Sequence, residues 1–166
     1  MTIDGGYIYS RATNNDGLDA NGNLYINGGL VYAIGARSPE LAIDANSEEQ
    51  KKLTITGGTI IAIGGLESGS SLQQSCYSAS WSASRWYSMT YGSETIAFKT
   101  PASGGNTMVL SASSKPTVKS GVTVSGGTSI LGDNVVISPT ITGGSSVTLS
   151  NYSSGGGNNP WSPWGW

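Results

Sequence analysis

The sequence contains no histidine, and this absence excludes several kinds of chemistry at once. A histidine-based catalytic triad, a zinc site with imidazole ligands and most acid–base catalysis near neutral pH all depend on that side chain. Cysteine is almost as scarce, because Cys76 is the only one in 166 residues. An intrachain disulfide is therefore impossible, and we expect Cys76 to be a small buried apolar residue.

Charged residues and long apolar segments are also in short supply. Asp, Glu, Lys and Arg make up 11% of the chain and the formal net charge is −2, so no basic stripe is present for a nucleic acid. No apolar run approaches the roughly 20 residues of a membrane-spanning helix. No signal peptide is visible, because a strand-like pattern begins at Thr2. The composition is similar to that of secreted bacterial surface proteins, and we expect a mature or excised piece of one.

What the sequence does contain is a repeated pentapeptide: a β-favouring residue, Ile or Val, a polar residue and two glycines. Its five copies begin at Thr2, Tyr25, Thr54, Thr123 and Thr140. The alternating stretch after each copy indicates a strand with one buried face. The Gly-Gly pair indicates a sharp bend, since glycine accepts backbone angles that are closed to other residues.

The spacing of these copies predicts the fold. The first three lie 23 and 29 residues apart, which suits turns of a right-handed parallel β-helix, an all-β solenoid whose coils bury their apolar side by stacking. The longer interval contains Ser47 to Lys52, which we interpret as a solvated loop. We expect the β-helix over residues 1–150 and a Gly/Pro/Trp-rich tail over 151–166. Three isoleucines should stack in one interior column: Ile3, Ile26 and Ile55. An antiparallel β-sandwich with Gly-Gly hairpin turns is the alternative.

The tripeptide Asp-Ala-Asn occurs at Asp19 and again 25 residues later at Asp44. If Leu18 and Ile43 stack inside adjacent coils, the two aspartates stack outside, about 4.8 Å apart. Like charges at that distance repel unless a cation neutralises them, and Ca²⁺ binds carboxylate, amide, carbonyl and water oxygens. Five side chains could supply such oxygens: Asp16, Asp19, Asn21, Asp44 and Asn46. The alternative is turn chemistry, because Asp and Asn also hydrogen-bond their own backbones.

Two stretches resemble the motifs of a known family. The first, from Asp16 to Tyr32, reads D-G-L-D-A-N-G-N-L-Y-I-N-G-G-L-V-Y and is followed by E-L-A-I-D-A-N. The second, from Leu53 to Gly64, reads L-T-I-T-G-G-T-I-I-A-I-G. Both are similar to secreted bacterial carbohydrate-binding domains, and the resemblance is closest over residues 2 to 75. It implies a right-handed parallel β-helix like that of pectate lyases, with calcium-assisted binding of polygalacturonate, a pectin-type acidic polysaccharide, without cleavage. The motif match assigns the calcium ligands as Asp16, Asp19 and Asp44.

Two arginines, Arg11 and Arg37, precede the acidic segments, and we expect them to pair with sugar carboxylates or with neighbouring Asp and Glu. A pectate-lyase-like reaction would need Lys or Arg as a base. Arginine is a poor base because it stays protonated, and the lysines of this region fall in the predicted loop. Glycoside hydrolysis needs one protonated carboxyl group, whereas metal binding would keep the aspartates ionised. The sequence therefore favours a binding protein over an enzyme, with a polysaccharide lyase as the minor alternative.

Aromatic residues crowd into the segment from Tyr77 to Tyr91. Exposed Trp and Tyr rings form platforms on which sugar faces stack, and they also anchor protein interfaces. We interpret three of these residues as carbohydrate-binding: Trp81, Trp86 and Tyr87. The alternative is that such rings close one end of the solenoid by covering its last apolar rung.

The end of the sequence supports a second hypothesis, the subunit of an extracellular filament. A Gly-rich spacer leads to tryptophans that are stiffened by Pro160 and Pro163, and exposed tryptophans tend to dock on a surface. Three of them either fold back on their own chain or bind the next subunit head-to-tail: Trp161, Trp164 and Trp166. An uncapped solenoid edge at Thr2 would offer unpaired strand groups to such a homo-oligomer.

Overall fold

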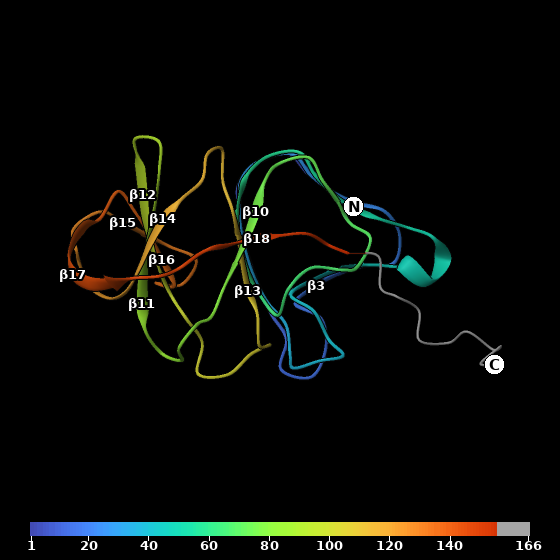
Figure 1. The fold of residues 1–166 in the computed structure, drawn as a ribbon, viewed down its shortest axis with the longest axis horizontal. Helices are drawn as coiled ribbons and strands as arrows, with labels where there is room; N and C mark the ends of the chain where they lie inside the picture. Colours follow the sequence, from blue (N-terminus) through green and yellow to red (C-terminus); the bar gives the residue numbers. More distant parts are fainter. Residues whose placement is uncertain (156–166) are drawn as a thin grey trace.

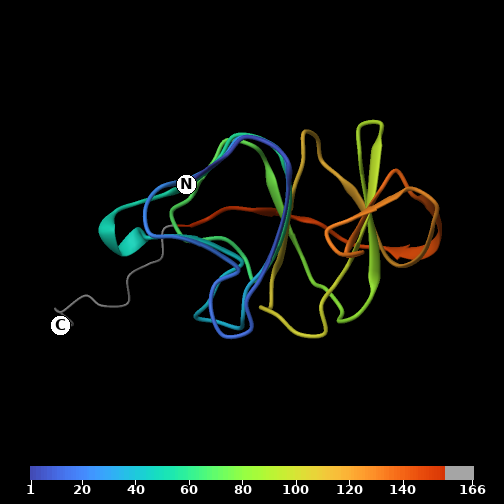
Figure 2. The ribbon, with the colours of Figure 1, turned by 180° about the vertical axis from the view of Figure 1, so that it is seen from behind.

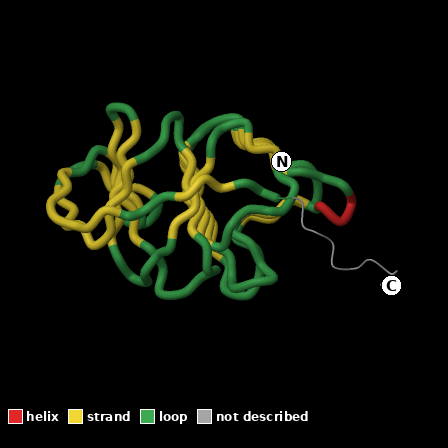
Figure 3. Tube along the Cα trace, viewed as in Figure 1, coloured by secondary structure: helices red, strands yellow, loops and turns green. Residues whose placement is uncertain are grey.

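The computed structural model describes residues 1–155, and this part of the chain is all-β. Figure 1 shows two halves along the long axis: stacked strands and loops in blue to green, and a sheet of later strands toward the orange end. One 3₁₀ turn, η1 (Ser47–Glu49), is the only helical element among these residues and is the red segment of Figure 3. The predictions for Trp161, Trp164 and Trp166 lie outside the described residues.

From Thr2 to Leu72 the chain passes through three sheets in a repeating order. Sheet A contains β1 (Thr2–Ile3), β4 (Leu24–Ile26), β7 (Leu53–Ile55) and β9 (Ser71–Leu72). Sheet B begins with β2 (Tyr7–Arg11), β5 (Leu30–Ile34) and β8 (Thr59–Ile63). Sheet C pairs β3 (Leu18–Ala20) with β6 (Ile43–Ala45), and Leu66 adds a single bridge to Ile43. All of these pairings are parallel, and each passage through A, B and C is called a repeat below.

The predicted interior columns are confirmed. Ile3 is the register partner of Ile26, and Ile26 is the partner of Ile55. Leu18 pairs with Ile43 in the same way. The side chains in the middle of these columns are fully buried, as expected when stacking repeats share one apolar core. The predicted loop over 47–52 is mostly exposed, and Cys76 is buried.

The Gly-Gly pairs carry the chain from sheet A to sheet B. Gly29 has a φ of +81°, which residues with a side chain rarely adopt. Gly57 is needed for a different reason, because a Cβ there would lie 2.4 Å from the carbonyl oxygen of Asn27 in the preceding repeat. The polar residue before each pair joins a ladder: Nδ2 of Asn27 donates to Oδ1 of Asp4 at 2.8 Å, and Oγ1 of Thr56 donates to Oδ1 of Asn27 at 2.7 Å. Each bend is thus fixed by the repeat beneath it.

Strand direction changes after β9, and here the structure differs from the parallel β-helix predicted over residues 1–150. Sheet B continues with three antiparallel strands: β13 (Met108–Ser111), β10 (Cys76–Ala79) and β18 (Ser150–Tyr152). A fourth sheet, D, is wholly antiparallel, in the order β15-β16-β12-β11-β14-β17. Its strands are β11 (Trp86–Tyr91), β12 (Glu94–Lys99), β14 (Thr117–Ser125), β15 (Thr128–Ile130), β16 (Val135–Ile137) and β17 (Thr140–Ser146). Within the described chain, parallel pairing is confined to residues 2–72.

Sheet B is buried on both faces, and in Figure 2 it lies between the two halves. On one face, side chains such as Val31 and Ile60 join the core that the three parallel sheets enclose. On the other face, Tyr32 and Ile61 pack in a second core with Phe98 of sheet D. Burial on both faces explains why β5 reads L-V-Y-A-I, a continuous apolar run rather than an alternation.

Candidate functional site

Two loops that connect sheet B to sheet C are stacked at one corner of the repeats. They are the loop after β2 and the loop after β5. The N–H of Ala36 donates to the carbonyl oxygen of Asn15 at 3.0 Å. The N–H of Leu41 donates to Oδ1 of Asp16 at 2.5 Å. Because the strands on either side are in register, the repeat itself brings these loops together.

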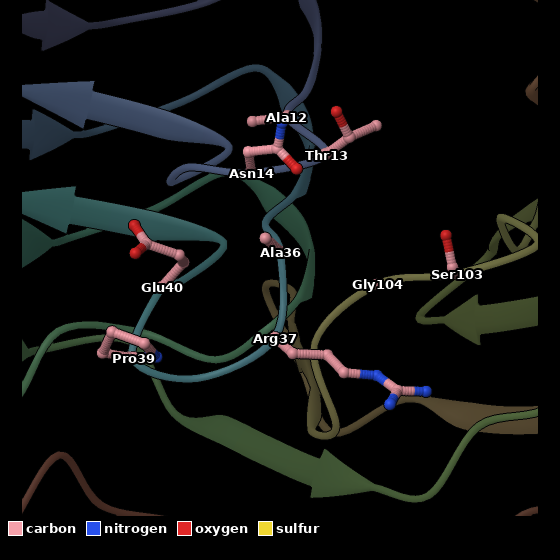
Figure 4. Close-up of a pocket in the computed structure, with 9 residues that line it drawn as sticks. All are labelled: Ala12, Thr13, Asn14, Ala36, Arg37, Pro39, Glu40, Ser103 and Gly104. Carbon is pink, nitrogen blue, oxygen red and sulfur yellow. The ribbon is translucent and has the colours of Figure 1, made fainter.

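A cavity of about 480 Å³ opens beside the stacked loops and is drawn in Figure 4. Its lining comes from both loops and from the loop before β13: Ala12, Thr13, Asn14, Ala36, Arg37, Pro39, Glu40, Ser103 and Gly104. In Figure 4 the Arg37 side chain extends away from Glu40 and toward the Ser103–Gly104 loop. We call this cavity the Arg37 groove, since its cation is the guanidinium of that residue.

A neighbouring cavity brings together two residues that were predicted for different reasons. It has a volume of about 250 Å³, shares Arg37, Ser103 and Gly104 with the Arg37 groove, and is also lined by Trp81. Nε1 of Trp81 donates to the carbonyl oxygen of Gly105 at 2.9 Å, which fixes the half-buried indole ring. A cation and an oriented aromatic ring therefore line one continuous surface.

The other residues predicted to bind carbohydrate lie elsewhere. Arg11 is exposed at the end of β2, and Trp86 is half-buried at the start of β11. Tyr87 is only 2% exposed, its hydroxyl accepts the N–H of Ser82 at 2.8 Å, and its ring stacks on Phe98. Tyr87 is therefore a core residue and not the exposed platform that we predicted.

The predicted acidic pair is in register, since Asp19 is the partner of Asp44 across sheet C. Leu66 bridges to Ile43, so the residue after it, Glu67, continues the same line of acids. We call Asp19, Asp44 and Glu67 the acidic row. Sequence reasoning missed Glu67. An aliphatic residue followed by an acid occurs at Leu18, again 25 residues later at Ile43 and again 23 residues later at Leu66. This pattern could have revealed Glu67.

At the centre of the row the pKa of Asp44 is raised to about 7. Burial of this half-buried carboxyl group is the largest cause, and nearby carboxylates add to it: Glu67, Asp16, Asp19 and Glu48. A carboxyl group that is half protonated near neutral pH lies where negative charge is poorly compensated. A cation at this place would remove that imbalance.

Some of the oxygens near the row are already engaged. Glu67 accepts two backbone N–H groups, at 3.0 and 2.8 Å, and Asp16 accepts one. Nδ2 of Asn46 donates to Oδ1 of Asn21 at 3.3 Å. Among residues 1–155, no three acidic, Cys or His side chains converge closely enough to hold a metal ion. The register pair of aspartates is therefore the best-placed acidic pair, and a shared cation would need water or a ligand for most of its oxygens.

The two connections that line the Arg37 groove lead into β3 and β6, the strands that carry Asp19 and Asp44. Asn14 lines the groove, and the chain reaches Asp19 five residues later. Glu40 lines the groove as well, and Asp44 follows four residues later.

Within the described part of the chain, no helix is both long and apolar enough to cross a membrane. No protein-family model matches the chain, and no curated protein and no solved structure is similar to it.

Proposed function

We propose that the chain is a non-catalytic, calcium-dependent binding domain for acidic polysaccharide of the polygalacturonate type, secreted to the bacterial cell surface. The observation that carries this proposal is that Arg37 and Trp81 line the same cavity. A guanidinium pairs with a carboxylate through two parallel hydrogen bonds, and an indole ring stacks on the apolar face of a sugar. Together these are the two contacts that a uronate residue requires.

Asp19 and Asp44 would hold the calcium ion, with Asn21, Asn46 and Asp16 beside them. Support comes from the register of the aspartates and from the raised pKa of Asp44. Calcium bound there would supply positive charge and open coordination positions for a carboxylate oxygen of the sugar. The two aspartates alone provide too few oxygens for calcium, which is consistent with a site completed by the polysaccharide.

For the fold of residues 2–72 we propose a right-handed parallel β-helix. Support comes from the parallel, in-register ladders of sheets A, B and C, which the chain visits in a constant order. A connection between parallel strands of one sheet is right-handed in nearly all proteins, because strand twist favours that hand. This arrangement places every B-to-C connection at the same corner, where the Arg37 groove lies.

Binding without cleavage is favoured by the bases that the chain offers near the groove. A lyase needs a group that can accept the proton next to the uronate carboxylate. An arginine side chain is too basic to serve as this acceptor, and Lys51 and Lys52 belong to the loop around η1 rather than to the groove lining. A polysaccharide lyase is therefore the lesser alternative.

Binding of polygalacturonate oligomers, followed by calorimetry with calcium and with a chelator, tests the proposal. We expect binding in calcium, its loss on chelation and its loss in Arg37→Gln. Arg85→Gln is the matched control, because Arg85 is an exposed arginine that does not line either cavity. Equal binding by Arg37→Gln and the control would contradict the proposed site. Unsaturated oligosaccharide products would establish the lyase instead.

A filament subunit is our second proposal, and one observation favours it. β1, β2 and β3 each lie at the edge of their sheets on the same side of the repeats. Edge strands present unpaired N–H and C=O groups that another chain can bind. Light scattering over a range of concentrations tests this idea, and a protein that stays monomeric at high concentration would exclude it.

A further inference from the structure

A third cavity lies at the opposite ends of the sheet B strands, where the Gly-Gly bends face the hairpin formed by β11 and β12. Its volume is about 490 Å³, within the range of small-molecule sites. Glycines of the first two bends line one side of it, and Tyr91 and Glu94 of the hairpin line the other. Six to seven strand residues separate this cavity from the Arg37 groove, or roughly 20 Å at the strand rise of about 3.3 Å per residue.

Tyr7, at the rim of this cavity, is an unusually exposed aromatic side chain. It is 59% exposed, more than the other large exposed apolar residues of the described chain, Met1 at 55% and Tyr25 at 40%. The bend before it is made by Gly5 and Gly6, where an added Cβ would meet nothing within 4 Å. The tyrosine ring therefore stands beside an open backbone surface, an arrangement suited to contact with a flat ligand face.

The polar end of the cavity offers a donor and an acceptor side by side. Tyr91 and Glu94 are cross-strand partners next to the hairpin turn, so their side chains point to the same side of the sheet. Oγ1 of Thr59 donates to the Tyr91 hydroxyl at 2.9 Å, and this hydroxyl is within hydrogen-bonding reach of the Glu94 carboxylate, so a ligand hydroxyl placed here would take over one of the contacts between the two side chains. The Glu94 carboxylate can only accept. This pair matches two neighbouring hydroxyl groups, each of which both donates and accepts.

The remaining lining decides the class of ligand. Leu30, Ile96 and Ile137 form an apolar floor. Glu94 is the one charged residue that lines the cavity, and its negative charge disfavours a uronate or a phosphate. An uncharged pyranose has the required properties, because one face consists of C–H groups and its edge carries hydroxyls.

We propose that this cavity is a binding site for a neutral pyranose residue, which stacks on Tyr7 and donates and accepts hydrogen bonds at Glu94 and Tyr91. The site uses neither Arg37 nor a metal ion, and it goes beyond the proposed function because its ligand has no charge. The chain would then hold two kinds of sugar at two separate places.

The test uses the full chain in the presence of a chelator, with methyl β-galactopyranoside as the neutral probe and galacturonic acid as its charged counterpart. Two-dimensional amide NMR should show saturable shifts for Gly6, Gly29 and Thr59 with the neutral probe, and weaker binding of the acid. Tyr7→Ala should weaken binding about tenfold through loss of the stacking ring. Tyr25→Ala is the matched control, since Tyr25 is exposed but lies outside the cavity lining.

Glu94→Gln should weaken binding of the neutral probe and reduce the preference over the acid, which a merely structural role of Glu94 would leave unchanged. Absence of saturable shifts in the wild type, or equal affinity of Tyr7→Ala and the wild type, would overturn the proposal. Arg37→Gln should bind the neutral probe normally, so failure at this cavity and failure at the Arg37 groove can be told apart.

Discussion

Replacing Asp19 by Asn is expected to stabilise the protein when calcium is absent. The two aspartates of the register pair occupy adjacent parallel strands, and the pKa of Asp44 is raised to about 7 chiefly by burial and in smaller part by nearby carboxylates that include Asp19. Asparagine keeps the shape and the hydrogen-bonding capacity of the side chain but removes the charge. The substitution therefore isolates the electrostatic cost of placing two carboxylates side by side.

The magnitude follows from the strand spacing. Two charges about 4.8 Å apart repel by about 0.9 kcal/mol in water and by about 3.5 kcal/mol at an effective dielectric constant of about 20. Asp19 is exposed, so the lower value applies, and we expect a gain of about 1 kcal/mol in alkaline buffer, above the Asp44 pKa of about 7, where both carboxyl groups are ionised. In a chain of 166 residues this corresponds to an increase in the melting temperature of about 2–4 °C.

Thermal unfolding of the wild type and of Asp19→Asn, each in chelator and in calcium, measures this effect. Calcium should raise the melting temperature of the wild type by binding the folded state, and it should raise that of the variant much less. Asp133→Asn serves as the control, because Asp133 is exposed and lies outside the acidic row. Oδ1 of Asp133 accepts the Ser129 hydroxyl, and asparagine keeps an oxygen that can accept this bond. Destabilisation of Asp19→Asn in chelator, or an unchanged response to calcium, would refute the reasoning.

Three further predictions follow from the repeats and the row. Ile55→Ala should lower the free energy of unfolding by about 2–5 kcal/mol in a urea titration, because it opens a cavity in a fully buried column. Ile3→Ala, at the edge of the same column, should lower it less. An equal loss in the two variants would argue against the stacking. Gly57→Ala should cost about 1–3 kcal/mol through collision with a carbonyl group of the preceding repeat, whereas Gly22→Ala, with open space around it, should be nearly neutral in the same assay. In chelator, stability should fall as the pH rises from about 4 to 7, because the folded protein holds the Asp44 proton more tightly than the unfolded chain does; melting curves of Asp44→Asn should lack this slope.

The sequence predicted the stacked columns of the parallel half because a repeat determines its own register. Once two copies of a pentapeptide stack, every side chain between them has an assigned neighbour. The pairing of Ile3 with Ile26 and of Asp19 with Asp44 followed from spacing alone, with no knowledge of the third dimension. Glu67 obeys the same rule but was not predicted, because the acid there is Glu and no Asp-Ala-Asn tripeptide marks it.

The antiparallel half could not be predicted in this way, because one local sequence serves two structures. T-I-T-G-G over residues 54–58 ends a parallel strand and turns the chain at its glycines. T-I-T-G-G over residues 140–144 lies within β17, where Thr142 pairs with Thr123 and Gly143 pairs with Val122. Both glycine pairs contain positive φ angles, yet only the first acts as a bend between sheets. The neighbouring strands decide the outcome, as is common for β-structure.

The Arg37 groove depends on contacts between segments that no sequence pattern linked. Arg37 was singled out by its place before the acidic segment, and Trp81 by the crowding of aromatic residues around it. They meet because the loop before β13 lies against the repeats. Gly105 makes that contact possible, since a Cβ there would stand 2.4 Å from Cα of Gly64. In the sequence this glycine indicates only a turn. Its role in allowing the loop to pack beside Arg37 is a property of the tertiary structure. The proposed carbohydrate-binding surface therefore depends on close packing between the repeats and the loop before β13.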